Sequence, residues 1–309
     1  MLAQLPPPPS GKTGWPWTEE SETLPPFQPD NKLWPRISIV TPSYNQGKFI
    51  EETIRSILLQ NYPNLEYLII DGGSTDDTLK IIEKYKKHIT YWVSEPDNGQ
   101  SQAINKGFRK SSGEYVNWIC SDDLLCQNAL TNTAQLLTAQ KDILLLGSGY
   151  RVDERTKLID KIESSEINNF NKLVDIRKFW RSGNSIIQQS ALYPVNAVKE
   201  AGFLRESNYY TMDFELWGKL MILGISVVRT DISIGMFRWY GGQKTSNQKL
   251  VSKSLVKSAQ QLVLSNKNAG IILKLLQMIK IYRYRIIYNY RLFRSYIGIK
   301  RRLKTMIHA

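Results

Sequence analysis

Residues 37–47 read ISIVTPSYNQG and residues 65–78 read LEYLIIDGGSTDDT, so in both segments a short apolar run leads into a polar turn. Two further apolar runs occupy residues 90–93 and 115–119. The segments between them carry apolar residues at the spacing of one helical face, as at Ile50, Ile54 and Ile57. Four short strands that alternate with helices predict an α/β fold with a mainly parallel central sheet flanked by helices.

Polar residues gather where each predicted strand ends, at residues 41–45, 71–74, 95–99 and 121–123. Ligands bind at the carboxyl ends of parallel strands, so these four segments are expected to form one site. Asp71 precedes two glycines that let a ligand approach the backbone closely, although an Asp here also suits a strand-to-helix turn. Asp122 and Asp123 are adjacent carboxylates, which repel one another unless a cation or a helix end stabilises them.

The composition excludes several classes of protein. With 309 residues, 42% of them hydrophobic, the chain can bury one large core or two modest ones. Its two histidines are His88, in a charged segment, and His308, in the terminal tail, so neither a zinc cluster nor a Ser/His/Asp triad is expected. Acid and base chemistry is therefore expected from carboxylates. Cys120 and Cys126 are expected to be reduced thiols without a disulfide or a metal role.

The net charge of +13 is concentrated in the C-terminal tail. Asp231 is the last acidic residue, and 16 of the 41 Lys and Arg residues follow it, which leaves the first 231 residues at about −3. We expect this tail to bind an anionic membrane surface without crossing it; packing on the domain or on a partner is the alternative. The residues spaced to form one apolar helical face are Ile271, Ile272, Leu275, Leu276 and Ile279, and those suited to a water–lipid boundary are Tyr282, Tyr284, Tyr288 and Tyr290.

Four segments, in this order, resemble glycosyltransferase family 2, whose members have the GT-A fold. They are residues 37–47, residues 65–78, residues 94–107 (SEPDNGQSQAINKG) and residues 118–123 (WICSDD). The resemblance implies an inverting transferase of the bacterial polysaccharide or cell-surface glycan type, with a nucleotide diphosphate sugar as donor and a glycan or lipid-linked hydroxyl as acceptor. It also implies a divalent metal, Mn or Mg, as cofactor.

The same resemblance implies roles for individual residues. Asp122 and Asp123 would hold the metal, and Asp213 would be the catalytic base, with helix capping as the alternative for Asp213 and Glu215 as the second choice of base. The acceptor side would include Gln188, Gln189 and Trp217. The donor would be held by Pro42, Ser43, Tyr44, Asp71, Gly72, Ser74, Gln100, Asn105 and Lys106.

Two of the departures from the family pattern concern the metal site, and a third is Gln102, which stands where relatives often carry an acid. Many relatives carry an Asp-x-Asp triplet where this chain has Cys120, Ser121 and Asp122, so the first carboxylate is missing and Asp122 is the best remaining ligand. Residues 238–245 (RWYGGQKT) resemble a loop that closes over the donor, but Tyr240 stands where relatives often carry a histidine. The third metal ligand is therefore left open.

The chain is expected to comprise a Pro-rich arm (residues 1–34), a GT-A domain (35–245) and a basic amphipathic helical tail (246–309). Within the domain, residues 35–125 would form the donor-binding half and residues 126–245 the acceptor half. The residues after Met1 lack the charged start and the continuous apolar run of a signal peptide. We therefore expect a cytoplasmic enzyme that is peripheral on the inner face of the membrane.

Two other functions account for parts of the pattern. A sugar-phosphate nucleotidyltransferase would share a GT-A-like sheet and a metal, but no Gly-rich loop bearing Lys and Arg follows the first strand. A basic tail with tyrosines is also typical of proteins that bind nucleic acid. Nothing in the domain indicates base recognition, so no nucleic-acid partner is expected.

Overall fold

The computed structural model describes residues 1–176, 178 and 186–285 of the chain. Its first half contains β1 (Ile37–Ser43), α1 (Ile50–Leu58), β2 (Leu65–Asp71), α2 (Thr78–Tyr85), β3 (Tyr91–Ser94), α3 (Gln100–Lys110) and β4 (Tyr115–Trp118). Its second half contains β5 (Leu124–Leu125), α4 (Ala129–Ala139), β6 (Ile143–Val152), β7 (Leu158–Ile162), α5 (Phe170–Val174), β8 (Ala191–Pro194), α7 (Val195–Glu200), α8 (Met212–Ile222), β9 (Ser226–Arg238) and α9 (Gln248–Ser265). The predicted alternation of strands and helices is confirmed.

Within the described residues the strands form one nine-stranded sheet, in the order β3-β2-β1-β4-β8-β6-β9-β5, with β7 paired to β6. β1 to β4 run parallel. β8 is antiparallel to both of its neighbours, whereas β6 and β9 are parallel. The sheet is therefore parallel through the predicted donor half and mixed beyond it. The chain moves outward in opposite directions from β1, and the carboxyl ends of strands at such a switch point are where α/β proteins bind ligands.

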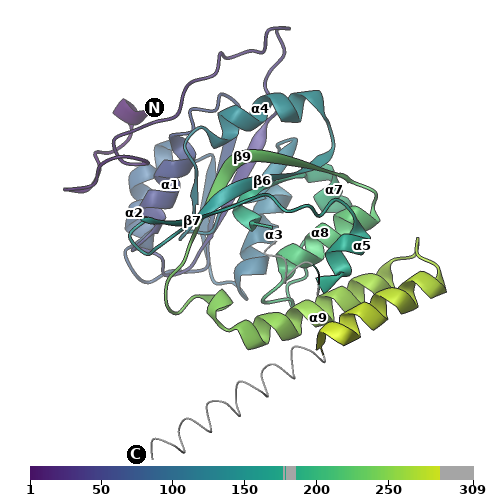
Figure 1. Cartoon of the computed structure of the whole chain (residues 1–309). Coiled ribbons are helices and arrows are strands. Elements are labelled where there is room, and N and C mark those ends of the chain that lie inside the picture. Colours follow the sequence, from purple (N-terminus) through teal and green to yellow (C-terminus); the bar gives the residue numbers. More distant parts are fainter. Residues whose placement is uncertain (177, 179–185, 286–309) are drawn as a thin grey trace, which may run out of the picture.

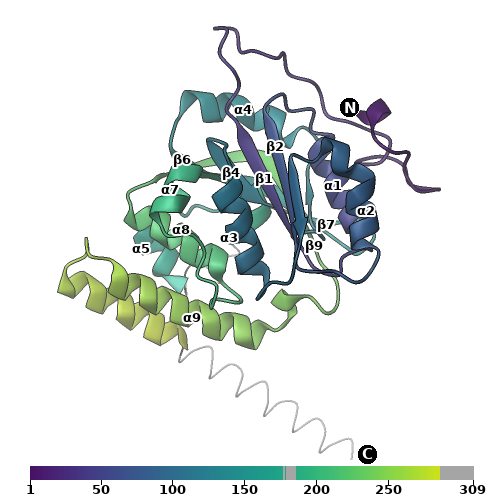
Figure 2. The same cartoon turned by 180° about the vertical axis from the view of Figure 1, so that it is seen from behind.

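Helices cover both faces of the parallel strands (Figure 1, Figure 2). Successive side chains of a strand point to opposite faces, and β1 is buried along its whole length. Ile39 packs in the cluster that contains the apolar faces of α1 and α2. Val40 packs in the other cluster, with Ile104 and Phe108 of α3. This two-sided burial explains why the strand is a continuous apolar run.

The arm of residues 1–34 lies against the domain, where Leu5, Trp17 and Trp34 are buried. Arg55 of α1 holds the arm in place although its guanidinium is fully buried. Its nitrogens donate to the carbonyl oxygens of Pro6 at 2.8 Å, Pro16 at 3.0 Å and Trp17 at 2.7 Å. A buried cation needs such partners, because an unpaired charge inside a protein is strongly destabilising.

α9 is part of the packed core. Leu255, Ala259 and Leu262 are buried in the same cluster as α8. A β-carbon added to Gly218 of α8 would lie 2.3 Å from Leu262, so the two helices meet where only glycine fits. The boundary predicted between residues 245 and 246 therefore falls before a helix that belongs to the core.

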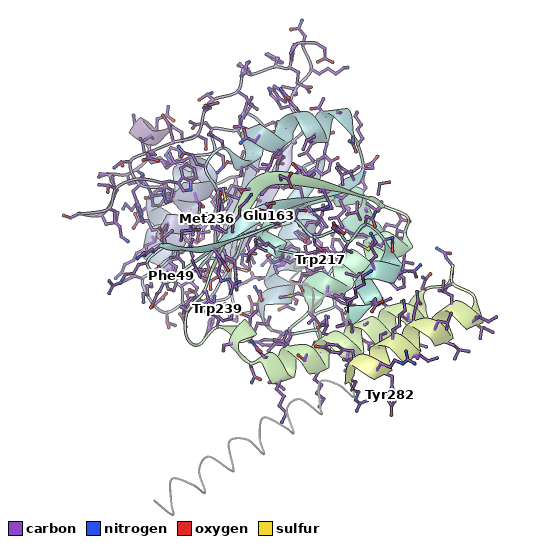
Figure 3. The ribbon with its side chains drawn as sticks, viewed as in Figure 1. Phe49, Glu163, Trp217, Met236, Trp239 and Tyr282 are labelled. Carbon is purple, nitrogen blue, oxygen red and sulfur yellow. The ribbon has the colours of Figure 1, made fainter. Side chains whose placement is uncertain are left out.

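Residues 271–285 form a further helix beside α9 (Figure 2). One face packs on the domain, with Ile281 fully buried and Gln277 donating to Asn171 Oδ1 at 2.6 Å. The opposite face is apolar and exposed, and Tyr282 points away from the domain (Figure 3). Among the described residues, no helix is both long enough and apolar enough to cross a bilayer.

We predict that Arg55→Met lowers the free energy of unfolding by about 2–4 kcal/mol, because three carbonyl oxygens of the arm, two of them in buried hydrogen bonds, lose a charged donor. Urea denaturation followed by circular dichroism measures the change. Arg155→Met, at an exposed arginine, is the matched control and should unfold like the unmodified protein. Equal stability of the two variants would contradict the role assigned to Arg55.

Candidate active site

A cavity of about 1400 Å³ lies at the carboxyl ends of β1, β2 and β4. The start of α8 and the β9–α9 loop (residues 239–247) close its other side. Ten of the predicted site residues line it: Pro42, Ser43, Tyr44, Gly72, Gln100, Asp122, Asp123, Gln188, Gln189 and Asp213. The expectation that separate strand ends meet in one polar site therefore agrees with the structure.

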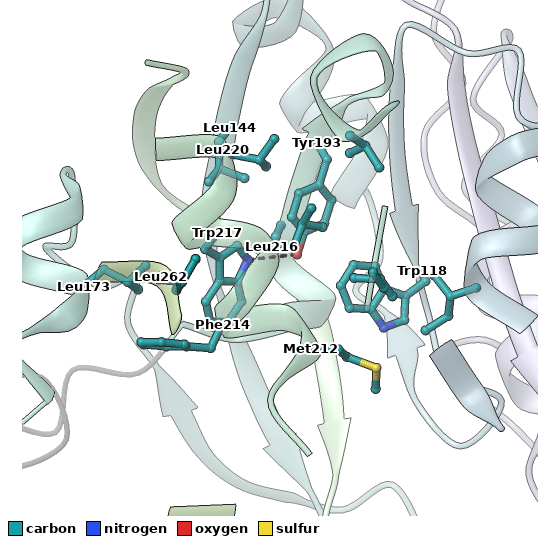
Figure 4. Close-up of a cluster of buried hydrophobic side chains, with 14 of the residues drawn as sticks. Trp118, Leu144, Leu173, Tyr193, Met212, Phe214, Leu216, Trp217, Leu220 and Leu262 are labelled. Carbon is teal, nitrogen blue, oxygen red and sulfur yellow. Dashed lines mark hydrogen bonds between the residues drawn. The ribbon is translucent and has the colours of Figure 1, made fainter. Parts of the chain in front are cut away.

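Five predicted residues are not among those that line the cavity: Asp71, Ser74, Asn105, Lys106 and Trp217. Asn105 is buried and exchanges hydrogen bonds with the backbone of Leu204. Lys106 pairs with Glu95. Trp217 lies in the core and donates to the Tyr193 hydroxyl at 3.0 Å (Figure 4). These three side chains are held by partners outside the cavity lining.

Asp71 stabilises the turn after β2. Its carboxylate accepts from the backbone of Gly73 at 3.0 Å and Ser74 at 2.8 Å, and from the hydroxyls of Ser74 at 2.5 Å and Ser94 at 2.7 Å. The sequence left two roles open for Asp71, contact with a ligand or a strand-to-helix turn. The hydrogen bonds of its carboxylate are those of the turn. Gly72 follows Asp71 closely packed, since a β-carbon there would lie 2.7 Å from the Asp97 carboxylate and would make that side chain move.

The two carboxylates after β4 are held differently. Asp123 is buried, and its oxygens accept from the Arg238 backbone at 2.9 Å and from Gln189 Nε2 at 2.6 Å. Asp122 accepts from the Tyr240 hydroxyl at 2.8 Å. Burial raises the pKa of both groups, and the charge of Asp122 raises the pKa of Asp123 further. Neither carboxylate caps a helix, since β5 follows directly.

This donor set fits a divalent cation. One oxygen from each carboxylate and the sulfur of Cys120 lie within 4.8 Å of one another. Two desolvated carboxylates side by side are unfavourable unless a positive charge offsets them, and carboxylate oxygens are ligands for Mg²⁺ and Mn²⁺. Asp122 is the better placed ligand, because both oxygens of Asp123 already accept hydrogen bonds from the protein.

Asp122 and Asp123 form what we call the acidic turn. Arg238, at the end of β9, fixes the backbone of this turn and was not predicted from the sequence. Its fully buried guanidinium donates to the Asp122 carbonyl at 2.7 Å, to the Glu154 carbonyl at 3.0 Å and to the Glu52 carboxylate at 2.8 Å. Arg238 and Asp122 are 116 positions apart, and no spacing rule connects them. The only signal in the sequence was the resemblance of residues 238–245 to a loop that closes over the donor.

Asp213 lies in the first turn of α8 and faces the cavity. Burial raises the pKa of its carboxyl group, while the positive charge of Lys244 opposes that shift. Glu215, the second choice, is turned into a polar cluster and accepts from Arg205 Nη2 at 2.6 Å and from Asn208 at 2.8 Å. Asp213 is therefore the carboxylate of α8 that is available to a ligand.

Lys244 of the β9–α9 loop was also not predicted from the sequence. Its ammonium donates to Gln100 Oε1 at 2.9 Å and lies 3.9 Å from the centre of the Tyr209 ring. Desolvation lowers its pKa to about 8, although the nearby Cys120 and Asp213 act in the opposite direction. The loop thus brings a cation between the acidic turn and α8.

Residues 38–202 match the sequence profile of Glycosyl transferase family 2. The chain belongs to this family. An uncharacterized glycosyltransferase of Rickettsia typhi is 30% identical over 193 residues, which cover 62% of this chain and 60% of that protein. The matched region therefore spans less than two thirds of the length of that relative.

Two solved structures share the fold. TarS of Staphylococcus aureus, residues 1–349 in complex with UDP-GlcNAc, has a TM-score of 0.62 at 18% identity and covers 80% of this chain and 71% of that chain. A mannosyltransferase of Pyrobaculum calidifontis in complex with GDP-Man and Mn²⁺ has a TM-score of 0.54 at 16% identity, with 86% and 77% covered. The predicted GT-A fold is confirmed.

We predict that Lys244→Met raises the pKa of Asp213, because the substitution removes a cation that favours the ionised carboxylate. In the unmodified protein this pKa should already exceed the ordinary value of 3.8. Carbon NMR of selectively labelled aspartates, titrated with pH, measures both values. Lys110→Met, on the exposed end of α3, is the control and should leave the Asp213 titration unchanged. An unchanged titration in Lys244→Met would contradict the electrostatic coupling.

Proposed function

We propose that this protein is an inverting glycosyltransferase, which moves a sugar from a nucleotide diphosphate sugar to an acceptor hydroxyl. The observation that carries the proposal is one cavity with the acidic turn of β4 on one side and Asp213 on the other. Family membership supports the same activity. The solved relatives hold UDP-GlcNAc or GDP-Man, so the donor proposed here is a nucleoside diphosphate sugar.

The cavity is large enough for two substrates. Sites for single small molecules typically have volumes of about 300–1,000 Å³, whereas this cavity has about 1400 Å³. We place the donor against the strand ends, with Pro42, Ser43 and Gly72, and the acceptor beside Asp213. We keep Gln188 and Gln189 on the acceptor side; both line the cavity, and Gln189 also donates to Asp123.

We assign the divalent cation to Asp122, with Asp123 beside it. When bound, the cation would stabilise negative charge on the departing diphosphate. The protein contributes the fixed positions of these acids, since Arg238 and Gln189 hold the turn and the second carboxylate. The Tyr240 hydroxyl donates to Asp122 and orients its carboxylate.

Asp213 is assigned as the general base. It takes the proton of the acceptor hydroxyl while that oxygen forms a bond to the anomeric carbon and the bond from this carbon to the diphosphate breaks. A single displacement inverts the anomeric centre. A base works best when its pKa approaches the working pH, and burial moves the pKa of Asp213 in that direction.

Asp213→Asn keeps the size of the side chain and removes its basicity, so we predict a loss of turnover of about 10²–10⁴-fold. A thermal-shift screen with UDP-GlcNAc and GDP-mannose, with and without Mn²⁺, first identifies the donor. Release of nucleoside diphosphate in the presence of glycan and lipid-linked acceptors then measures turnover.

Asp77→Asn, at an exposed acid before α2, is the control and should retain full turnover. Donor affinity should be unchanged in both variants, because Asp213 is placed on the acceptor side. Turnover of Asp213→Asn within a few-fold of the unmodified enzyme would remove the base assignment.

We further propose that the helix of residues 271–285 attaches the enzyme to an anionic membrane surface. Ile271 and Ile272 are 79% and 76% exposed, and Leu275, Leu276 and Ile279 are exposed beside them. Apolar side chains at an aqueous surface favour insertion among lipid headgroups, and the Lys and Arg residues of this tail would add electrostatic attraction. Of the predicted tyrosines, Tyr282 is exposed, whereas Tyr284 packs against the core and lines the cavity, so its prediction was wrong. Tyr288 and Tyr290 lie outside the described residues.

Flotation with vesicles of phosphatidylcholine and phosphatidylglycerol tests this attachment. We predict that the protein floats with these vesicles at low salt, and that Ile272→Glu combined with Leu276→Glu abolishes flotation. The matched control combines Leu158→Glu with Ile159→Glu, at the exposed apolar pair of β7, and should float normally. Equal flotation of both double variants would reject the helix as the attachment site.

A further inference from the structure

The cavity contains a sulfur atom whose role the proposed reaction does not explain. Cys120 follows β4, is half-buried and lines the cavity together with Asp122 and Asp123. Its sulfur lies within 4.8 Å of one oxygen from each of these carboxylates. Two metal–ligand bonds of about 2.0–2.3 Å span at most about 4.6 Å, so the three atoms can contact one ion once the side chains close slightly around it.

The hydrogen bonds of the site leave few oxygen ligands for a cation. Both oxygens of Asp123 accept from the protein, and Oδ2 of Asp122 accepts from the Tyr240 hydroxyl. The sulfur of Cys120 is therefore the further donor that the cavity offers beside these oxygens.

Gln100 orients a donor toward this sulfur. Its Oε1 accepts from the Lys244 ammonium at 2.9 Å, which determines which end of the amide is the oxygen. Nε2 consequently faces Cys120 Sγ, at 3.0 Å. A hydrogen bond from an outer side chain to a ligand atom is a regular feature of metal sites, where it fixes the ligand and tunes its affinity.

We propose that Cys120 Sγ is a ligand of the divalent cation held by Asp122, and that it makes the site selective for thiophilic cations over Mg²⁺. The thiol proton leaves to solvent as the sulfur binds. Soft sulfur ligands favour Zn²⁺ and Cd²⁺, while Mg²⁺ prefers a set of oxygens only. The inference rests on the cation site of the proposed function and specifies its chemical preference.

Cadmium provides a readout that does not depend on turnover, because a cadmium–sulfur bond produces an ultraviolet charge-transfer band. We expect Cd²⁺ to produce this band in the unmodified protein and in Cys126→Ser, whose sulfur is buried outside the cavity. Cys120→Ser should lose the band and bind Cd²⁺ at least about tenfold more weakly. Asp122→Asn should weaken the binding of both Cd²⁺ and Mn²⁺.

A second variant keeps the test decisive if Cys120→Ser does not fold. Cys120→Asp restores a carboxylate, so it should bind Mn²⁺, measured by electron paramagnetic resonance, at least as tightly as the unmodified protein and show no cadmium band. Thermal unfolding of both variants checks that they are folded.

Two results would overturn the role of Cys120 and leave the cation site intact. In the first, the unmodified protein binds Mn²⁺ but shows no cadmium band. In the second, the band persists in Cys120→Ser. Failure of the unmodified protein to bind either Mn²⁺ or Cd²⁺ would instead overturn the cation site itself, and with it the metal-assisted form of the proposed function.

Discussion

The buried ion pair between Arg238 and Glu52 determines the geometry of the acidic turn. The guanidinium and the carboxylate meet at 2.8 Å, and Arg238 is fully buried. From this position Arg238 also holds the backbone of Asp122 and, through its own amide, the carboxylate of Asp123. Loss of one partner would leave the other charge unpaired in the interior, which typically costs about 3–5 kcal/mol. The candidate metal ligands thus depend on a contact between the end of β9 and α1.

A second buried arginine links the N-terminal arm to the same helix. Arg55 and Glu52 lie one turn apart on α1, and Arg55 is held by carbonyl oxygens of the arm. α1 therefore carries one contact to the arm and one to the acidic turn. The arm is therefore joined to the domain by buried hydrogen bonds as well as by the burial of its apolar side chains.

The local sequence pattern was sufficient to predict the parallel strands and the polar residues at their ends. Burial on both faces gives a continuous apolar run, and the polar turn follows that run directly in the sequence. It was not sufficient for side-chain direction. Asp71 and Asn105 are polar residues beside the site, but their hydrogen bonds turn them into the surrounding structure. Arg238 and Lys244 reach the site from the β9–α9 region, and a contact of that kind depends on the tertiary fold. The apolar spacing in the tail agrees with an exposed helical face, although spacing alone did not show which face would be covered.

The separation of Glu52 and Arg238 has a consequence for synthesis of the chain on the ribosome. The two residues are 186 positions apart. At about 5–20 residues per second, roughly 10–40 s pass between the appearance of the carboxylate and that of the arginine which pairs with it. During this interval the first strands and helices can pair, but the acidic turn lacks the hydrogen bonds that Arg238 donates to it. The acidic turn therefore acquires its final geometry only after the end of β9 has emerged from the ribosome, when the other strands of the sheet are already available for pairing.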